Sequence, residues 1–348
     1  MRVDRYIIRS VLELTVLVAL VLLVVYTLAA FIADLGNTGR GGLSIAGLAE
    51  HTALLTPSTL YLLMPVIALV GTLLGLGALA RCGELTAMRT AGVSMARVGL
   101  AVLGAGALLG AVSFALGDWI GPAGEHAAAA LRAESSDTPG QALWLRDADS
   151  VVRIGRLDAE DHIADVTVFR LRADGTLADG LYAVDGRYRQ GVWRLRQVRE
   201  TRFDGDVVDA GSMPVLDWRS GVTPQVLRLF ILEENSLSTV GLLRLIAYLD
   251  DNHLDAQKYR LLLWRKLFEP LTVMVMALLA VPFVSGSLRG ASAGQRLLLG
   301  LLVGLVFYVV NKVSVSFGAI YDYSPVLAAG APTALLALAA VWQLRRNR

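Results

Sequence analysis

Residues 81–97 read RCGELTAMRTAGVSMAR, a short polar segment between two long uncharged runs, 54–80 and 98–117. These runs decide the fold, because each is long enough to cross a bilayer. A basic segment between two membrane spans usually lies on the cytoplasmic side. We call residues 81–97 the connecting segment. It is either an inert loop or a binding site for a soluble partner protein.

The composition is that of an integral membrane protein. Hydrophobic residues make up 55% of the chain, charged residues 18%, and the mean hydropathy is +0.56. The net charge of +2 is too small to suggest nucleic acid as a partner. The single cysteine, Cys82, excludes an intrachain disulfide framework and a multi-thiolate metal site.

Apolar runs of about 20 residues, the length needed to cross a membrane, occur three times before a long polar region and three times after it. The runs are 14–33, 54–80, 98–117, 270–288, 297–319 and 323–344. We therefore predict an α-helical membrane protein with six transmembrane helices in a 3+3 layout. We divide it into residues 1–117 with spans one to three, 118–265 as an inserted region, and 266–348 with spans four to six.

Arginine sets the orientation. It is concentrated at alternate ends of the spans, at Arg2, Arg5, Arg9, Arg81, Arg89, Arg97, Arg289, Arg296, Arg345, Arg346 and Arg348. The short loops on the opposite side carry only Arg40. The positive-inside rule then places both termini and the connecting segment in the cytoplasm, and the inserted region outside.

The inserted region changes period at about residues 140–220. Short alternating segments rich in Val, Tyr, Phe and Trp are separated by the turn pairs Asp174–Gly175, Gln190–Gly191 and Asp204–Gly205. Strands at this spacing favour a β-sandwich or β-jellyroll of about 80 residues.

Small residues four positions apart recur in the spans, at Gly71/Gly75, Gly106/Gly110 and Gly300/Gly304. Such pairs let helices approach closely in lipid. They serve packing within one subunit or an interface between subunits.

The chain lacks the motifs of an enzyme. It has no Gly-Lys pair and hence no phosphate loop, no paired intramembrane aspartates, and no histidine and cysteine cluster for a metal. We expect no catalytic residues, no metal and no cofactor. If the protein transports actively, ATP is bound and hydrolysed by another chain.

Ionisable residues in or near the spans are the candidates for substrate contact. Lys312 lies toward the outer end of the fifth span; it either extends to the headgroups or faces a cavity that takes an anionic, phosphate-bearing substrate. Lys266 and Arg265 lie at the outer mouth of the fourth span, as interfacial anchors paired with Glu269 or as substrate contacts.

The connecting segment has helix signals of its own. Residues 84–91 can form two turns, with Arg89 near the C-terminal end and Gly92 suited to the position after the helix. Leu85 and Met88 share a face, with Glu84 beside them. An ordinary loop needs no apolar face, so this pattern predicts a short helix that seats in a partner's groove.

Several segments in order resemble a known family. They are VDRYI (3–7), LGLGALARCGELTAMRTAGVS (74–94), GDWIGPAGE (117–125), LSTVGLLRLIAYL (237–249), YRLLLWRKLFEPL (259–271) and SGSLRGASAGQRLLLGLLVGLVFYV (285–309). Together with the final span they resemble the LptF/LptG permeases of the lipopolysaccharide-export ABC transporter, and LptG more closely. Each motif alone is weak; their order over the whole chain makes the resemblance specific.

The resemblance implies a permease subunit that extracts lipopolysaccharide from the outer leaflet of the inner membrane and passes it to a periplasmic β-jellyroll bridge. Its implied partners are an LptF-like sister permease, an LptB-like ATPase dimer and an LptC-like membrane-anchored jellyroll protein. Residues 81–93 correspond to the coupling helix held by the ATPase, with Glu84, Leu85, Met88 and Arg89 as contacts. The region of Lys312 corresponds to the gate-forming fifth span, and 264–270 to the cavity mouth.

One departure from the family concerns phosphate binding. LptG proteins often carry basic residues at the periplasmic end of the first span, whereas residues 28–42 here offer only Arg40. Either Arg40, Lys312 and Lys266 neutralise the lipid A phosphates, or this subunit contributes less to binding them.

Two other functions fit the same layout. One is an LptF-type sister subunit or another ABC lipid exporter. The other is a non-transporting membrane assembly or sensor protein that uses its β domain to bind a partner. Co-purification with a phosphate-loop ATPase separates the transporters from the assembly protein.

Overall fold

The computed structural model describes residues 2–35, 44–135, 142–147, 150–159, 161–172, 176–204, 207–224, 226–227, 237–252, 254–285, 292–320 and 323–346. The chain divides into two compact units. One contains 1–38, 44–128 and 257–348; the other contains 39–43 and 129–256.

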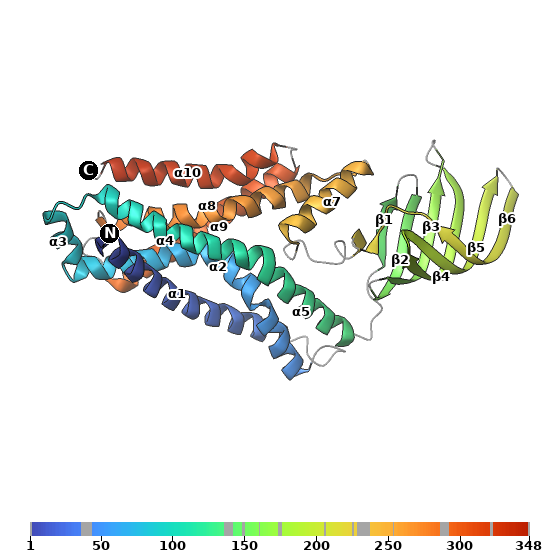
Figure 1. The fold of residues 1–348 in the computed structure, drawn as a ribbon, viewed down its shortest axis with the longest axis horizontal. Coiled ribbons are helices and arrows are strands. Elements are labelled where there is room, and N and C mark those ends of the chain that lie inside the picture. Colours follow the sequence, from blue (N-terminus) through green and yellow to red (C-terminus); the bar gives the residue numbers. More distant parts are fainter. Residues whose placement is uncertain are drawn as a thin grey trace. The chain divides into compact units, whose positions relative to one another are not determined.

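The first unit is a helical bundle (Figure 1). Its long helices are α1 (Arg2–Leu35), α2 (Ile45–Arg81), α4 (Met95–Ala115), α8 (Gln257–Ser285), α9 (Ala293–Ile320) and α10 (Pro325–Arg346). The short helix α3 (Glu84–Thr90) lies between α2 and α4, and α4 continues through the π-helical turn η1 (Leu116–Ile120) into α5 (Gly121–Ser135). Among the described residues, six helical stretches are long and apolar enough to cross a membrane, which confirms the predicted number.

Two of these helices are longer than the uncharged runs suggest. The third continues past residue 117 to Arg132, and α8 begins at Gln257 rather than at Pro270. A count of uncharged residues places the end of the third span at Asp118 and the start of the fourth after Glu269. The side chains of Asp118 and Glu269 are buried in the bundle, at 8% and 7% exposure, so these charged residues lie within the helices rather than beyond their ends.

Helix α2 lies at the centre of the bundle, and small residues set its contacts. A Cβ atom at Gly75 would lie 2.9 Å from Cα of Val11 in α1, and one at Gly300 would lie 2.9 Å from Val70 Cγ2. On the other side, Gly110 of α4 packs against the carbonyl of Pro270. The predicted small-residue pairs therefore serve packing within this subunit.

Burial is uneven among the helices. In α2, 72% of the most apolar window is buried, against 17% in α9 and 6% in α1. Helices α1 and α9 thus present apolar surface outward from this chain.

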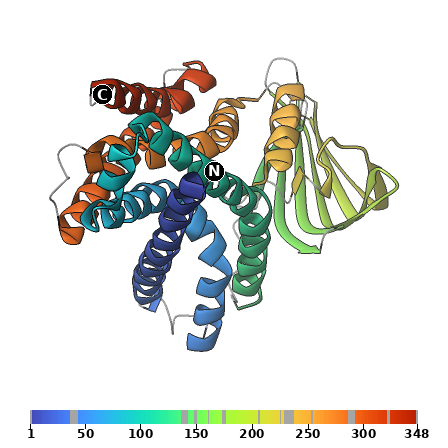
Figure 2. The ribbon, with the colours of Figure 1, turned by 60° about the vertical axis from the view of Figure 1, so that its left-hand side comes forward.

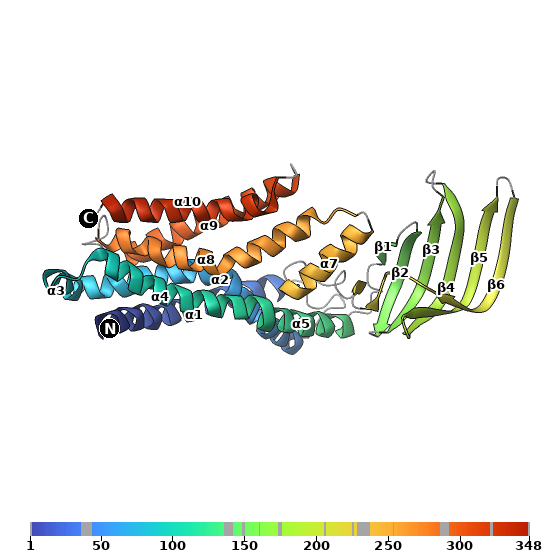
Figure 3. The ribbon, with the colours of Figure 1, turned by 45° about the horizontal axis from the view of Figure 1, so that its top comes forward.

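The second unit contains, in its described residues, a six-stranded antiparallel sheet (Figure 3). The sheet is inserted in the sequence between the third and fourth long helices, where a β domain was expected. Its strands are β1 (Leu143–Asp147), β2 (Ser150–Ala159), β3 (His162–Leu171), β4 (Leu177–Arg189), β5 (Val192–Asp204) and β6 (Val207–Trp218). Gln190 and Gly191, with φ of 51° and 85°, form the expected tight turn between β4 and β5.

A row of residues that have no partner in the antiparallel strand ladder crosses the sheet, and we call this row the crease. It consists of Gly155, Asp165, Val184, Gln197 and Pro214, one residue from each of β2 to β6. Register continues on both sides, but Asp165 and Gln197 adopt φ near 54° and 53°. These left-handed residues reverse the side-chain alternation and bend the strands.

The crease keeps the apolar side chains on one face as the strands turn. In β5 the buried positions change from Trp193 and Leu195 before it to Val198 after it. Figure 2 shows the resulting curvature of the sheet. Helix α7 (Thr239–Asp251) completes this unit, and the Tyr248 hydroxyl donates a 2.8 Å hydrogen bond to the carbonyl of Arg146.

The jellyroll topology is not confirmed. Each described strand pairs with its neighbours in the sequence, in the order β1-β2-β3-β4-β5-β6. A jellyroll divides its strands between two sheets with crossing connections. The alternating pattern predicted the strands, whereas the crease lets one sheet curve around its own apolar face.

Candidate functional site

The connecting segment forms a turn, a helix and a second turn. Gly83, with φ of 76°, precedes α3, and Gly92, with φ of 89°, follows its C-cap Ala91. Glycine adopts this left-handed conformation without the steric cost that a Cβ atom brings. The predicted helix is confirmed, and Gly92 has the predicted place at its end.

The apolar face of α3 is directed into its own bundle. Leu85 is 6% exposed and belongs to the main hydrophobic core, and Met88 packs against that core. Leu85 therefore faces its own bundle rather than a partner's groove, whereas Met88 is half-buried and its contact with a partner stays a prediction. Periodicity identified the apolar face, but α3 is too short to stay folded without burying that face against a neighbour.

The opposite face of α3 is exposed. Thr86, Ala87, Arg89 and Thr90 are all open to solvent, and Glu84 is half-buried at the rim. Glu84 accepts a 2.8 Å hydrogen bond from the Tyr6 hydroxyl of α1. An exposed polar face with one fixed carboxylate is suited to a soluble protein partner.

Lys266 has an acidic neighbour inside the bundle. Its Nζ atom lies 3.6 Å from Asp118 Oδ1, and the two side chains are 8% and 9% exposed. Asp118 lies in η1, and a π-helical turn of this kind changes the direction of side chains within a helix. No local pattern in the sequence pointed to this pair, because its members are 148 residues apart along the chain.

Arg265 and Glu269 lie one helical turn apart in α8. Arg265 is half-buried, whereas Glu269 is 7% exposed. Glu269 thus lies beside the two basic residues of α8, as expected, and Asp118 of η1 adds a second carboxylate, which is the one that lies 3.6 Å from Lys266.

Lys312 lies in a different environment. Its side chain is exposed on α9, among the exposed apolar residues Val309, Val313 and Phe317. Of the four basic residues predicted to contact substrate, Lys266 is buried, Arg265 half-buried and Lys312 exposed, and Arg40 lies outside the described residues. The described residues contain no group of three or more His, Cys, Asp or Glu side chains placed to hold a metal ion.

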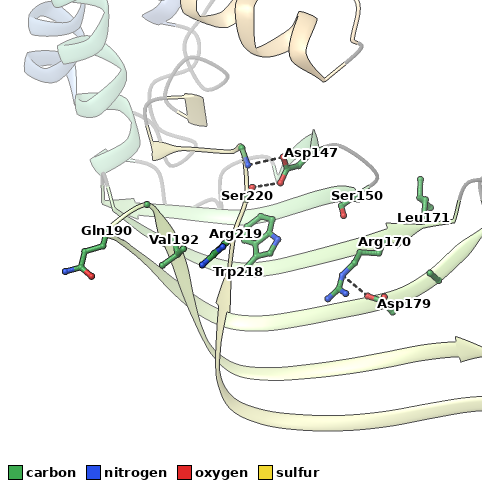
Figure 4. A pocket seen from close by; sticks show the side chains of 13 residues that line it. Asp147, Ser150, Arg170, Leu171, Asp179, Gln190, Val192, Trp218, Arg219 and Ser220 are labelled. Atoms are coloured by element: carbon green, nitrogen blue, oxygen red, sulfur yellow. Dashed lines mark hydrogen bonds and ion pairs between the residues drawn. The ribbon is translucent and has the colours of Figure 1, made fainter.

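The β unit contains an open cavity of about 1020 Å³ that the sequence did not predict (Figure 4). Asp147 accepts hydrogen bonds from the Ser220 hydroxyl and the Gly221 amide, at 2.5 and 3.1 Å. Across the cavity, Arg170 Nε lies 3.2 Å from Asp179 Oδ1. Asp179 is thus paired with a cation, whereas the hydrogen bonds to Asp147 fasten the segment after β6 to the end of β1.

Comparison with known proteins gives one family and several relatives. A model of the family described as "Lipopolysaccharide export system permease LptF/LptG" matches residues 5–346. The lipopolysaccharide export system permease protein LptG of Escherichia coli (strain K12) is 31% identical over 352 residues, covering 99% of this chain and 98% of the relative. LptG of Haemophilus influenzae is 29% identical with the same coverage.

Proposed function

Since the chain belongs to the lipopolysaccharide export system permease LptF/LptG family, we propose that it is a permease subunit of an ABC transporter for lipopolysaccharide. The subunit extracts lipopolysaccharide from the outer leaflet of the inner membrane and passes it to a periplasmic β-jellyroll bridge. The observation that carries this proposal is the family match over nearly the whole chain. The six apolar helices and the inserted sheet agree with it.

The proposal assigns the LptG-type position, because the relatives described above are LptG proteins. A sister permease of the LptF type completes the membrane part. A separate ATPase dimer of the LptB type binds and hydrolyses ATP, so this chain is the non-catalytic permease.

The ATPase contact is assigned to the exposed face of α3. Thr86, Ala87, Arg89 and Thr90 supply that surface, and Glu84 supplies a carboxylate. Leu85 and Met88 pack α3 against its own bundle, on the side of the helix away from the assigned ATPase contact. A coupling helix needs both properties, because a partner can move the bundle only through a helix fixed to it.

The lipopolysaccharide contact is assigned to Lys312. An ammonium group among exposed valines suits a phosphorylated lipid, which brings anionic phosphates and apolar chains to the same surface. Arg265 and Arg40 are further candidates. Lys266 is assigned to packing with Asp118.

Both termini and the connecting segment are cytoplasmic in this proposal, and the sheet is periplasmic. β6 is an edge strand with mostly exposed side chains. An edge of this kind can pair with a strand of an LptC-like jellyroll protein by β-augmentation, which would extend the sheet into a bridge.

Purification tests the proposal. The tagged chain is expressed in a Gram-negative host and extracted in detergent. It is expected to co-purify with a sister permease and a phosphate-loop ATPase in fixed stoichiometry. The complex in proteoliposomes is expected to release lipopolysaccharide to an acceptor only with ATP. A chain that purifies without any ATPase would contradict the permease function.

One variant tests the ATPase contact. Glu84→Lys is expected to lower ATPase co-purification at least fivefold, and Glu50→Lys, which changes a carboxylate exposed on α2, is the control.

A second variant tests the lipopolysaccharide contact. Lys312→Glu is expected to lower photo-crosslinking of lipopolysaccharide without loss of the complex. Unchanged crosslinking would place Lys312 at the outer headgroups instead.

A further inference from the structure

The first turns of α1 contact both ends of the connecting segment. Tyr6 donates from its hydroxyl to Glu84 Oε2 at 2.8 Å, at the start of α3. Arg97, at the start of α4, donates from Nε and Nη2 to the two carboxylate oxygens of Asp4 at 2.9 and 3.0 Å. Figures 1 and 3 both place the N-terminus of α1 beside the connecting segment.

The two contacts constrain α1 in complementary ways. A bidentate arginine–carboxylate pair fixes orientation as well as distance. The Tyr6 hydroxyl occupies only one of the acceptor positions of the Glu84 carboxylate. An external cation can therefore bind Glu84 while Tyr6 keeps its hydrogen bond.

The next turns of α1 are seated closely on α2. Ile7 and Val11 are 0% exposed, and the backbone of Val11 lies against Gly75. One turn later, Thr15 lies against Gly71. The base of α1 is therefore held from two sides, by the connecting segment and by α2.

The rest of α1 is largely uncovered by this chain. Its side chains Val16, Leu17, Leu20, Val21, Val24, Val25, Leu28 and Ile32 are 50–65% exposed. A continuous helix of 34 residues is about 50 Å long. A helix that is fixed at its base and largely uncovered above can move as a lever, because its backbone hydrogen bonds keep it stiff.

We propose that Tyr6 and Asp4 are positioning residues that make α1 move with the connecting segment, so that a displacement of α3 reaches the uncovered half of α1. The proposal rests on the proposed function, in which the ATPase displaces α3. Without these contacts α3 can move while α1 stays in place, and ATP is then hydrolysed without release of lipid.

The test uses the complete complex with its sister permease and ATPase in proteoliposomes. ATP hydrolysis and lipopolysaccharide release to an acceptor are measured together, and their ratio is the readout. The double variant Tyr6→Phe/Asp4→Asn is expected to lower lipid released per ATP at least threefold, while ATPase association and hydrolysis stay within twofold. Tyr323→Phe removes an exposed hydroxyl far along the chain and serves as the control.

A charge exchange separates positioning from general stability. Asp4→Arg and Arg97→Asp are each expected to lower the ratio, and the two together to restore it. A merely structural role would instead lower complex yield and hydrolysis in parallel, with the ratio unchanged.

A wild-type ratio in Tyr6→Phe/Asp4→Asn would overturn the proposal, as would failure of the exchanged pair to restore the ratio in an assembled complex. Absence of ATP-dependent release from the wild-type complex would contradict the proposed function itself. The two failures are therefore distinguishable.

Discussion

Lys266 shows how burial changes the role of a charged residue. Its ammonium and the Asp118 carboxylate are both less than a tenth exposed and lie 3.6 Å apart. Breaking a buried ion pair by removing one partner typically costs about 3–5 kcal/mol, whereas replacing both partners with apolar residues is often neutral. We expect Lys266→Leu to lower the thermal stability of the purified chain sharply, and Lys266→Leu/Asp118→Leu to recover most of it.

The same pair of variants tests the alternative role of Lys266 in substrate binding. If Lys266 contacts a lipopolysaccharide phosphate, the double variant lowers lipid crosslinking even though it is stable. Normal crosslinking in the stable double variant would assign Lys266 to packing. Lys312→Glu provides the comparison, because Lys312 is exposed.

Asp185 links the stability of the sheet to pH. Its hydrogen bonds with Arg196, at 2.8 and 2.5 Å, hold the pKa of the Asp185 carboxyl below its usual range. A lowered folded-state pKa stabilises the fold fully above the unfolded pKa of about 4, and this stabilisation is lost as the pH falls through the folded value. The β unit should therefore be less stable below about pH 4.

We expect Asp185→Asn to destabilise the sheet by up to about 1 kcal/mol at pH 7, as for a partly exposed pair. The difference from wild type should shrink as the pH falls below about 4. Thermal unfolding followed by tryptophan fluorescence reports on it, because Trp193 is fully buried in the neighbouring strand β5. Asp209→Asn on β6 is the control, and a difference that persists at acid pH would contradict the assignment.

At the scale of elements, α3 depends on the glycine before it. Gly83 has φ of 76°, and nothing lies within 4 Å of the place where its Cβ would be. A substitution there acts through backbone strain alone, at about 1–2 kcal/mol for a residue that avoids the left-handed region. Asparagine tolerates that region far better than valine.

Gly83→Val is therefore expected to displace α3 and lower ATPase co-purification several-fold, while Gly83→Asn keeps most of it. The measurement is the ratio of ATPase to permease in the purified complex. Equal ratios for the two variants would mean that the conformation at Gly83 does not position the contact.

The elements also show what the sequence can predict. Apolar runs predicted six helices, Gln190–Gly191 predicted a tight turn, and the cap signals predicted α3, because each signal is local. The sequence did not predict which face of α3 turns inward, since Leu85 is buried in the hydrophobic core that residues distant in the sequence form. Nor did it predict the crease, where Asp165 and Gln197 adopt positive φ and have no ladder partner in the neighbouring strands.

The site residues, too, could be predicted only where the signal is local in the sequence. Glu84 and Arg89 could be singled out from the connecting segment because they lie in the first and last turns of a helix with cap signals. Tyr6 and Asp118 could not, because their partners Glu84 and Lys266 are 78 and 148 residues away in the sequence. A charged residue in a membrane span is interpreted as a substrate contact when its buried ion-pair partner is not known.

At the scale of the molecule, orientation in the membrane is the property on which the proposed function depends. The ATPase can reach α3 only from the cytoplasm, and the sheet can form a bridge only in the periplasm.

Thiol labelling tests this orientation, because Cys82 is the single cysteine of the chain and is exposed in the turn before α3. In spheroplasts, a membrane-impermeant maleimide should label Cys82 only after the membrane is permeabilised. The variant Cys82→Ser/Ser212→Cys, with its thiol exposed on β6, should be labelled without permeabilisation. Labelling of Cys82 in intact spheroplasts would reverse the orientation and remove α3 from the reach of any cytoplasmic ATPase. When the ATPase is bound, Cys82 should also react more slowly in permeabilised membranes, because it adjoins the surface assigned to that contact.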